Sequence, residues 1–243
     1  MWGIDKMIDI HTHVLPRIDD GPRDWETSLG MLADSVKLDV KKVIATPHYY
    51  PWRRNVSPEE VREKCRQAKE KLQEEYGLEI EVYAGHEIYY SVDTLQKLKS
   101  GEMLTLADSN YVLLEFSDEE PFTVIYRAVR EFTEHGYTPI LAHVERYKNL
   151  YKESNLVAVK ENGALLQVNV ESLKDGIWDK KSQWVKKQLK KETIDFLASD
   201  MHNSTDRPPY TEENLQRIRK MVEPRYINRL MCDNCEKIIL NLR

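Results

Sequence analysis

The stretch Met7-Ile-Asp-Ile-His-Thr-His13 predicts a short apolar β-strand that ends in two histidines. Six further β-rich runs follow along the chain, at residues 42–46, 79–84, 111–116, 138–142, 164–170 and 194–199. Helical patterns lie between these runs, at about residues 25–38, 58–77, 92–100, 122–135, 181–190, 211–222 and 234–242. Strands that alternate with helices are typical of β/α units, so the sequence predicts an α/β fold with a parallel sheet.

Two of the predicted helices have recognisable starts. We expect Ser57 to cap the helix that begins at Pro58, because a serine side chain accepts a backbone N–H there and proline is favoured in the first turn. We expect Asp233 or Asn234 to cap the last helix. A helix start is favoured over a redox or zinc role for Cys232-Asp-Asn-Cys235, since the sequence contains no second half-site.

Polar residues at the ends of the predicted strands distinguish an open sheet from a closed barrel. Parallel strands direct their C-terminal ends to one rim, and a closed barrel brings those ends to a single mouth. An open sheet would spread them along a line, so the barrel is favoured. With no linker and no internal repeat, one domain over residues 1–243 is expected. The rim residues are His11, His13, Asp19, Asp20, His48, Glu87, Glu115, His143, Asp200 and His202.

These rim residues predict metal binding. Burying several unpaired carboxylates costs several kcal/mol each unless cations neutralise them. The set contains imidazoles and carboxylates but no thiolate, which suits Mn, Fe, Co or catalytic Zn. Eight or nine ligands are too many for one ion. The sequence therefore predicts two or three divalent ions, with a carboxylate such as Glu87 available as a bridge.

Composition excludes several other classes of protein. The chain has 243 residues, with 36 Lys+Arg against 41 Asp+Glu, a balance that argues against a nucleic-acid partner. No apolar run approaches ~18 residues and no signal peptide is recognised, so we expect no membrane insertion. Three cysteines make no disulfide framework, which favours a reducing cytoplasm. The glycine spacings fit no phosphate-binding loop, and no cysteine is followed six positions later by arginine, which excludes thiol-phosphatase chemistry.

Six segments carry a resemblance to a known family. The chain resembles the polymerase-and-histidinol-phosphatase (PHP) superfamily and, more narrowly, the bacterial manganese-dependent protein-tyrosine phosphatases of capsule and exopolysaccharide operons, the CpsB/YwqE type. The segments are Asp9-Ile-His-Thr-His-Val-Leu-Pro-Arg-Ile-Asp-Asp-Gly21, Ile44-Ala-Thr-Pro-His48, Gly85-His-Glu-Ile88, Val112-Leu-Leu-Glu-Phe116, Ile140-Leu-Ala-His-Val-Glu-Arg146 and Ala198-Ser-Asp-Met-His-Asn203.

The resemblance implies a distorted (β/α)7, TIM-barrel-like fold and a three-metal site. One ion would be bound by His11, His13, Glu87 and Asp200, and a second by Glu87, Glu115 and His143. A third would be bound by Asp20, His48 and His202, where Asp20 is chosen over Asp19 because it directly precedes Gly21. Manganese is the first choice of metal, with Fe, Co or Zn as alternatives.

The resemblance also implies hydrolysis of phosphotyrosine by a metal-bridging hydroxide. Arg146 and Arg207 follow the ligand segments and are expected to clamp phosphate oxygens. This chain departs from the usual pattern at Val144, at His86 and at Arg17, where relatives carry glycine or another small residue. None of these departures removes a ligand, and Arg17 is a candidate for altered substrate preference.

The implied partner is a phosphotyrosine protein, the tail of a bacterial tyrosine autokinase of polysaccharide export, and a homo-oligomer is a further possibility. One alternative function is hydrolysis of histidinol phosphate or another small phosphoester, and a distant one is a non-catalytic, metal-stabilised regulatory module. Two interpretations remain open for the loop after His48. Either its aromatic residues flank the phosphotyrosine ring and its arginines meet an acidic peptide, or the loop is a partly buried cover. These loop residues are Tyr49, Tyr50, Trp52, Arg53 and Arg54.

Overall fold

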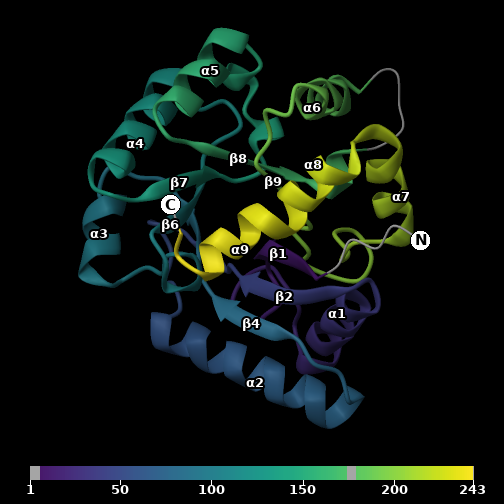
Figure 1. Ribbon diagram of the computed structural model, residues 1–243. Coiled ribbons are helices and arrows are strands. Elements are labelled where there is room, and N and C mark those ends of the chain that lie inside the picture. Colours follow the sequence, from purple (N-terminus) through teal and green to yellow (C-terminus); the bar gives the residue numbers. More distant parts are fainter. Residues whose placement is uncertain (1–5, 174–178, 243) are drawn as a thin grey trace.

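The computed structural model describes residues 6–173 and 179–242, which form a curled parallel sheet surrounded by helices (Figure 1). The strands are β1 (Met7–Thr12), β2 (Val40–Ala45), β3 (His48–Tyr49), β4 (Glu81–Ala84), β5 (Glu87–Tyr89), β6 (Tyr111–Glu115), β7 (Thr138–Leu141), β8 (Leu165–Asn169) and β9 (Phe196–Ala198). The α-helices are α1 (Trp25–Lys37), α2 (Pro58–Tyr76), α3 (Thr94–Ser100), α4 (Phe122–Glu134), α5 (Glu153–Glu161), α6 (Lys180–Lys190), α7 (Glu212–Met221), α8 (Pro224–Asn228) and α9 (Asn234–Ile239).

The nine strands correspond to the seven that the sequence predicts, because two of them are interrupted. β2 and β3 are separated only by Thr46-Pro47, and β4 and β5 only by Gly85-His86. Every pairing is parallel, in the order β1, β2/β3, β4/β5, β6, β7, β8, β9. The ring closes where the Thr12–Met201 bridge joins β1 to the end of β9. The predicted distorted barrel is therefore confirmed.

Two buried apolar clusters fill this architecture. The smaller cluster brings together side chains from strands that are not neighbours, so it lies inside the barrel; its members include Ile8, Ile44, Leu113, Ile140 and Ala198. The larger cluster joins the outer faces of the strands to the helices. In β6, for example, Leu113 belongs to the inner cluster while Val112 and Leu114 belong to the outer one, as the period of two requires.

The helices agree with the prediction except near the C-terminus and at α5, which the sequence analysis did not predict. Ser57 caps α2 by accepting the Glu60 N–H at 3.2 Å, as expected. The predicted cap of the last helix is wrong. Asp233 has helical dihedral angles, and α8 continues through a π-helical turn (Arg229–Asp233) into α9 without a break. Of the described helices, none is both long and apolar enough to cross a membrane.

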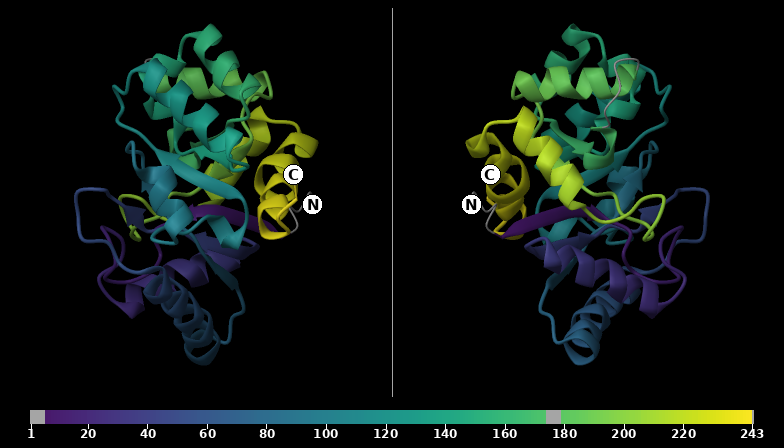
Figure 2. Two further views of the ribbon diagram at one scale, coloured as in Figure 1. Left: turned by 90° about the vertical axis from the view of Figure 1, so that its left-hand side faces the viewer. Right: turned by 90° about the vertical axis from the view of Figure 1, so that its right-hand side faces the viewer.

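The two ends of the barrel differ. In Figure 2 the yellow C-terminal helices lie on one side of the strands, and the purple and blue loops that follow the early strands project on the opposite side. Because the strands are parallel, all their carboxyl ends meet at the end where these loops project.

Candidate metal centre

Histidines and carboxylates from six strand ends converge at one end of the barrel. Three overlapping groups each have ligand atoms within 4.8 Å of one another. The groups are His11, His13, Glu87 and Asp200; His13, Asp20, His48 and His202; and His48, Glu87 and Glu115. Every rim residue that the sequence predicts is thus part of this cluster or in contact with it.

His11 of β1 and His13, which directly follows β1, meet at the centre of the cluster. Their Nε2 atoms are 3.2 Å apart, and each lies 3.2–3.4 Å from an oxygen of Glu87 and of Asp200. The pairing of β1 with β2 shifts register between Asp9 and Thr12. Both imidazoles are buried, so their Nε2 atoms face the carboxylate oxygens of Glu87 and Asp200 and not solvent.

The other ring nitrogens of these histidines are held by hydrogen bonds. His13 Nδ1 is 2.7 Å from Asp19 Oδ2, and His11 Nδ1 is 3.0 Å from Gln167 Oε1. When Nδ1 donates to an oxygen, Nε2 is left with its lone pair free for a metal ion. The arrangement is the one expected of metal-binding histidines.

Asp19 and Asp20 are distinguished by their contacts. Besides His13, Asp19 accepts the backbone N–H groups of Gly21 and His48, at 3.0 Å each. Asp20 instead lies 3.2 Å from His202 Nε2 and 3.5 Å from His48 Nε2. Asp20 is therefore the candidate ligand of the pair, and Asp19 supports His13.

Glu87 belongs to two of the three groups and contacts His13 and His48 of the other. Its Oε1 is 2.7 Å from His143 Nε2, and its Oε2 is 2.9 Å from His48 Nδ1 without hydrogen-bond geometry. His143 Nε2 is also 3.5 Å from Glu115 Oε1. A carboxylate that faces several imidazoles with both oxygens is suited to bridge two ions.

The electrostatics of the cluster favour charged carboxylates. Burial alone would raise the pKa of Glu87, but His11 and His48 hold it well below the usual range. The pKa of Asp200 is likewise lowered against burial, by His11 and His13. Burial and Arg146 oppose protonation of His143, yet Glu115 and Glu87 raise its pKa to about 9. Ionised carboxylates at neutral pH are the form that binds cations.

Backbone conformations that are rare for residues other than glycine occur at two of the candidate ligands. Asp200 has φ +53° and His143 has φ +32°. Such conformations cluster at functional sites, where the surrounding structure holds them. The Asp200 N–H donates to His11 O at 3.0 Å, and the His143 N–H donates to Gln167 Oε1 at 2.7 Å. Gly21 allows the neighbouring turn to approach closely, because a Cβ atom there would lie 2.3 Å from His13 O.

The residues fit divalent metal ions. Glu87 Oε2, His48 Nδ1 and His202 Nε2 are buried without a hydrogen-bond partner in the described structure, and each faces other members of the cluster. Buried polar atoms are normally satisfied, so these unpaired carboxylate and imidazole atoms fit a site that binds cations. With only nitrogen and oxygen donors, the set suits Mn, Fe, Co or catalytic Zn, as the sequence predicts.

The contribution of β8 to the cluster was not predicted from the sequence. Gln167 Nε2 donates to Asn169 Oδ1 at 2.8 Å, and Asn169 Nδ2 donates to Asp200 Oδ2 at 2.7 Å. Together with the Gln167–His11 contact, these bonds form a chain between two candidate ligands. The signal was present in Leu165-Leu-Gln-Val-Asn169, whose polar residues two apart must share one face of the strand.

Both predicted arginines lie at the cluster. Arg146 Nη2 is 3.0 Å from Asp200 Oδ2, and Arg207 Nη2 is 2.7 Å from Asp20 Oδ2. Arg17 lies apart from them: it is exposed and donates to Arg23 O at 2.9 Å. Its φ of +60° is a conformation that glycine adopts at lower cost than arginine.

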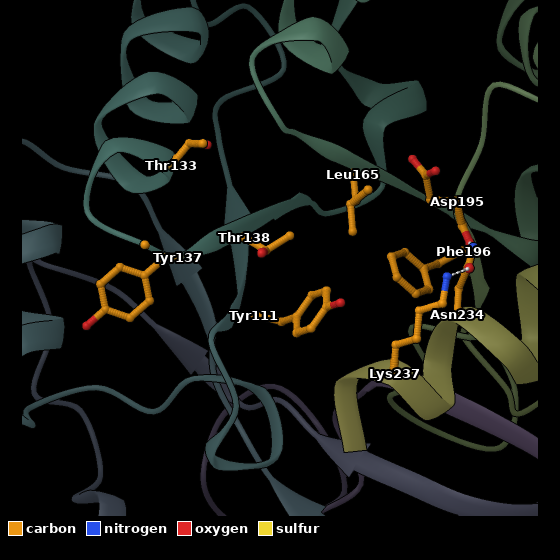
Figure 3. A pocket seen from close by; sticks show the side chains of 10 residues that line it. Tyr111, Thr133, Tyr137, Thr138, Leu165, Asp195, Phe196, Asn234 and Lys237 are labelled. Carbon is orange, nitrogen blue, oxygen red and sulfur yellow. Dashed lines mark hydrogen bonds between the residues drawn. The ribbon is translucent and has the colours of Figure 1, made fainter. Parts of the chain in front are cut away.

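A separate cavity of about 400 Å³ lies at the opposite end of the barrel (Figure 3). It is lined by residues at or near the starts of β6 to β9, including Tyr111, Leu165 and Phe196, and by Lys237 of α9. In Figure 3, Asn234 of α9 reaches the carbonyl of Asp195, at 2.9 Å. Because this cavity lies at the amino ends of the strands, it is separate from the histidine–carboxylate cluster at their carboxyl ends.

Comparison with known proteins gives consistent matches over nearly the whole chain. The sequence model of the family described as "Capsular polysaccharide synthesis, CpsB/CapC" matches residues 7–240. The tyrosine-protein phosphatase CpsB of Streptococcus pneumoniae is 34% identical over 97% of this chain and 99% of its own length. The tyrosine-protein phosphatase YwqE of Bacillus subtilis is 32% identical over 88% of this chain and 84% of its own length. A solved structure from work on YwqE of Bacillus subtilis and CpsB of Streptococcus pneumoniae, described as unique metal-dependent tyrosine phosphatases, aligns with a TM-score of 0.87. It is 30% identical, over 98% of this chain and 96% of that one.

Proposed function

The chain belongs to the CpsB/CapC family of capsular polysaccharide synthesis, and on that basis we propose that it is a metal-dependent protein-tyrosine phosphatase. The family and the fold that the sequence predicts are confirmed, and the predicted enzyme class agrees with the names of the relatives. The observation that carries the proposal is the convergence of three histidine–carboxylate groups at the carboxyl ends of the strands.

The proposed ligands are those of the sequence analysis. His11, His13, Glu87 and Asp200 would hold one ion, Glu87, Glu115 and His143 a second, and Asp20, His48 and His202 a third. The contacts of Glu87 with both His143 and His48 support its bridging role. We propose manganese as the native metal on the family resemblance, since nitrogen and oxygen donors suit Fe, Co or catalytic Zn as well as Mn.

When bound, divalent ions would lower the pKa of a water molecule towards 7 and neutralise the charge on a phosphate. The chain itself supplies orientation. Arg146 and Arg207 present guanidinium groups beside Asp200 and Asp20, where they can donate paired hydrogen bonds to phosphate oxygens. A tyrosine leaving group, with a pKa of about 10, needs only modest protonation, so no strong general acid is required of the chain.

The substrate we propose is the phosphorylated, tyrosine-rich tail of an autokinase of polysaccharide export. We also propose a cytoplasmic location and a single domain over the whole chain. The partner follows from the family alone, and assembly into a homo-oligomer stays a prediction.

Steady-state kinetics on matched peptides test the proposal. We expect phosphotyrosine peptide and p-nitrophenyl phosphate to be hydrolysed, with weak action on the phosphoserine peptide, because a phenolate leaves more readily than an alkoxide. A strong chelator should abolish the activity, and metals added singly should restore it, with Mn²⁺ the most effective. Thiol alkylation should do little, since burial raises the pKa of Cys65 to about 12 and also raises that of Cys235.

Two outcomes would contradict the proposal. Preferred turnover of histidinol phosphate would move the protein to small-phosphoester hydrolysis. A metal-loaded protein without phosphatase activity on any of these substrates would favour the non-catalytic alternative.

A further inference from the structure

A row of aromatic side chains continues the row of candidate ligands out of the barrel. In β3 and β5, His48 pairs with Glu87 and Tyr49 with Ile88. Because alternate residues share one face, Tyr50 and Tyr89 come next on the face of His48 and Glu87. Two residues along a strand advance the chain by about 6.6 Å. His48 and Glu87 thus form a charged row at the mouth of the barrel, and Tyr50 and Tyr89 form an aromatic row two residues further along the strands.

The aromatic row is completed by Trp52. The ring centroids of Tyr50 and Trp52 are 5.1 Å apart, those of Trp52 and Tyr89 are 4.7 Å apart, and those of Tyr50 and Tyr89 are 5.8 Å apart. Tyr50 connects these rings to the cluster, since its centroid is 4.7 Å from that of His48. We call Tyr50, Trp52 and Tyr89 the aromatic ledge.

The position of the aromatic ledge is fixed by contacts within the loop itself. Asn55 closes the loop: its Oδ1 accepts the Tyr50 N–H at 2.9 Å, and its Nδ2 donates to Tyr50 O at 2.8 Å. Arg53 lies over the Tyr50 ring at 4.6 Å and fixes it further. Even so, Trp52 is 61% exposed. The loop is fixed, yet it leaves a tryptophan exposed beside the histidine–carboxylate cluster. Such an exposed aromatic surface indicates a binding site for a ligand.

The neighbouring Tyr49 shows what a covering aromatic looks like in this loop. It is buried, with its ring 5.6 Å from that of His86, and it belongs to the outer apolar cluster. The two interpretations left open by the sequence thus apply to different residues: Tyr49 covers the barrel, whereas Tyr50, Trp52 and Tyr89 face its mouth.

We propose that the aromatic ledge binds the phenyl ring of the substrate, chiefly through Trp52 and Tyr89, while the phosphate lies at the histidine–carboxylate cluster. The inference rests on the proposed function and adds to the leaving-group effect a second source of preference for aryl over alkyl esters, which is binding of the ring. The ring of an aryl ester begins one oxygen atom away from phosphorus. Because Tyr50 of the ledge contacts His48 of the cluster, a ring so close to a phosphate bound at the cluster can lie against the ledge. Aromatic pairs contribute attraction beyond their buried area, which an alkyl chain does not gain.

Binding of two phosphonates to the manganese-loaded protein tests the ledge without turnover. Benzylphosphonate and methylphosphonate share the charged group and differ by the ring. We expect wild type to bind benzylphosphonate about ten times more tightly, and Trp52→Ala and Tyr89→Ala each to reduce that preference about two- to tenfold. Affinity for methylphosphonate and metal content should stay unchanged. Tyr89→Phe should keep the preference, and Tyr76→Ala, which removes an exposed tyrosine from the end of α2, is the matched control.

The outcomes separate the two proposals. A wild type that binds both phosphonates equally, or a ring preference that survives in Trp52→Ala and Tyr89→Ala, overturns the ledge even if phosphotyrosine is hydrolysed. Equal loss of affinity for both phosphonates in Trp52→Ala overturns it as well, because the ring would then not be what the ledge recognises. Failure of wild type to hydrolyse phosphotyrosine peptide overturns the proposed function, whatever the phosphonates show.

Discussion

Asp19 and Asp20 are consecutive carboxylates with different contacts. Asp19 is enclosed by hydrogen bonds from His13, Gly21 and His48, so it fixes the imidazole and the turn. Asp20 is half exposed and is left to face His48 and His202. The sequence predicts that one of the two is a ligand, but it cannot choose between them on spacing, because the direction of each side chain depends on the turn around Gly21.

At the residue scale, Arg146 is expected to act on the phosphate and not on the metals. Arg146→Ala should lower kcat on phosphotyrosine peptide about 10²–10³-fold, the range for one preorganised electrostatic donor, and leave the metal content unchanged. His13→Ala should lose metal and activity together, because it removes a central candidate ligand. Metal content by elemental analysis, measured beside kcat, separates the two effects.

The contact between Arg146 and Asp200 gives this prediction a clear alternative. If the arginine serves only to position Asp200, Arg146→Ala will lose metal as His13→Ala does. If turnover stays normal, Arg146 is structural, and phosphate orientation must come from Arg207 or the metals.

At the scale of elements, strand periodicity was the reliable signal. All seven predicted strands are present, and the ends of the predicted runs differ from those of β1, β2, β4, β6, β7, β8 and β9 by two residues or fewer, because a period of two and the flanking turns are local features. The short continuations β3 and β5 lie beyond the predicted runs. The helical turn between α8 and α9 could not be predicted in the same way. Asp233 and Asn234 are good capping residues, yet packing against the strands keeps the chain helical through both, and tertiary contacts override the local preference.

Strand β8 gives the prediction at this scale. It contributes no candidate ligand to the three groups, but Gln167 accepts from His11 Nδ1 and from the His143 N–H. Gln167→Ala should weaken metal binding about 10–100-fold, the range for losing a hydrogen-bond partner of a metal-bound histidine. Titration with Mn²⁺ measures the effect, and Gln96→Ala on the exposed face of α3 is the control. An unchanged metal affinity in Gln167→Ala would mean that β8 only fills the barrel.

At the scale of the whole molecule, the candidate ligands connect distant parts of the chain. They extend from residue 11 to residue 202, across the point where β1 and β9 close the barrel through a single bridge. In the described structure this closure has the fewest paired residues of the ring, and the candidate ligands His11, His13, Asp200 and His202 lie next to it in the sequence. Bound ions would therefore hold together the two ends of the sheet as well as the substrate.

Metal binding is accordingly expected to stabilise the fold. An ion present at 100 times its Kd stabilises the folded state by about 2.7 kcal/mol, which for a chain of this size raises Tm by about 5–10 °C. Thermal unfolding of the chelated protein, followed with and without Mn²⁺, should show this rise in one cooperative transition if the chain is a single domain. His13→Ala should show little rise, and Tyr76→Ala should behave as wild type. An equal rise in His13→Ala would place the stabilising ion elsewhere, whereas a Tm that does not respond to Mn²⁺ in the wild type would mean that the folded chain does not bind Mn²⁺ in preference to the unfolded chain, and would contradict the proposed site.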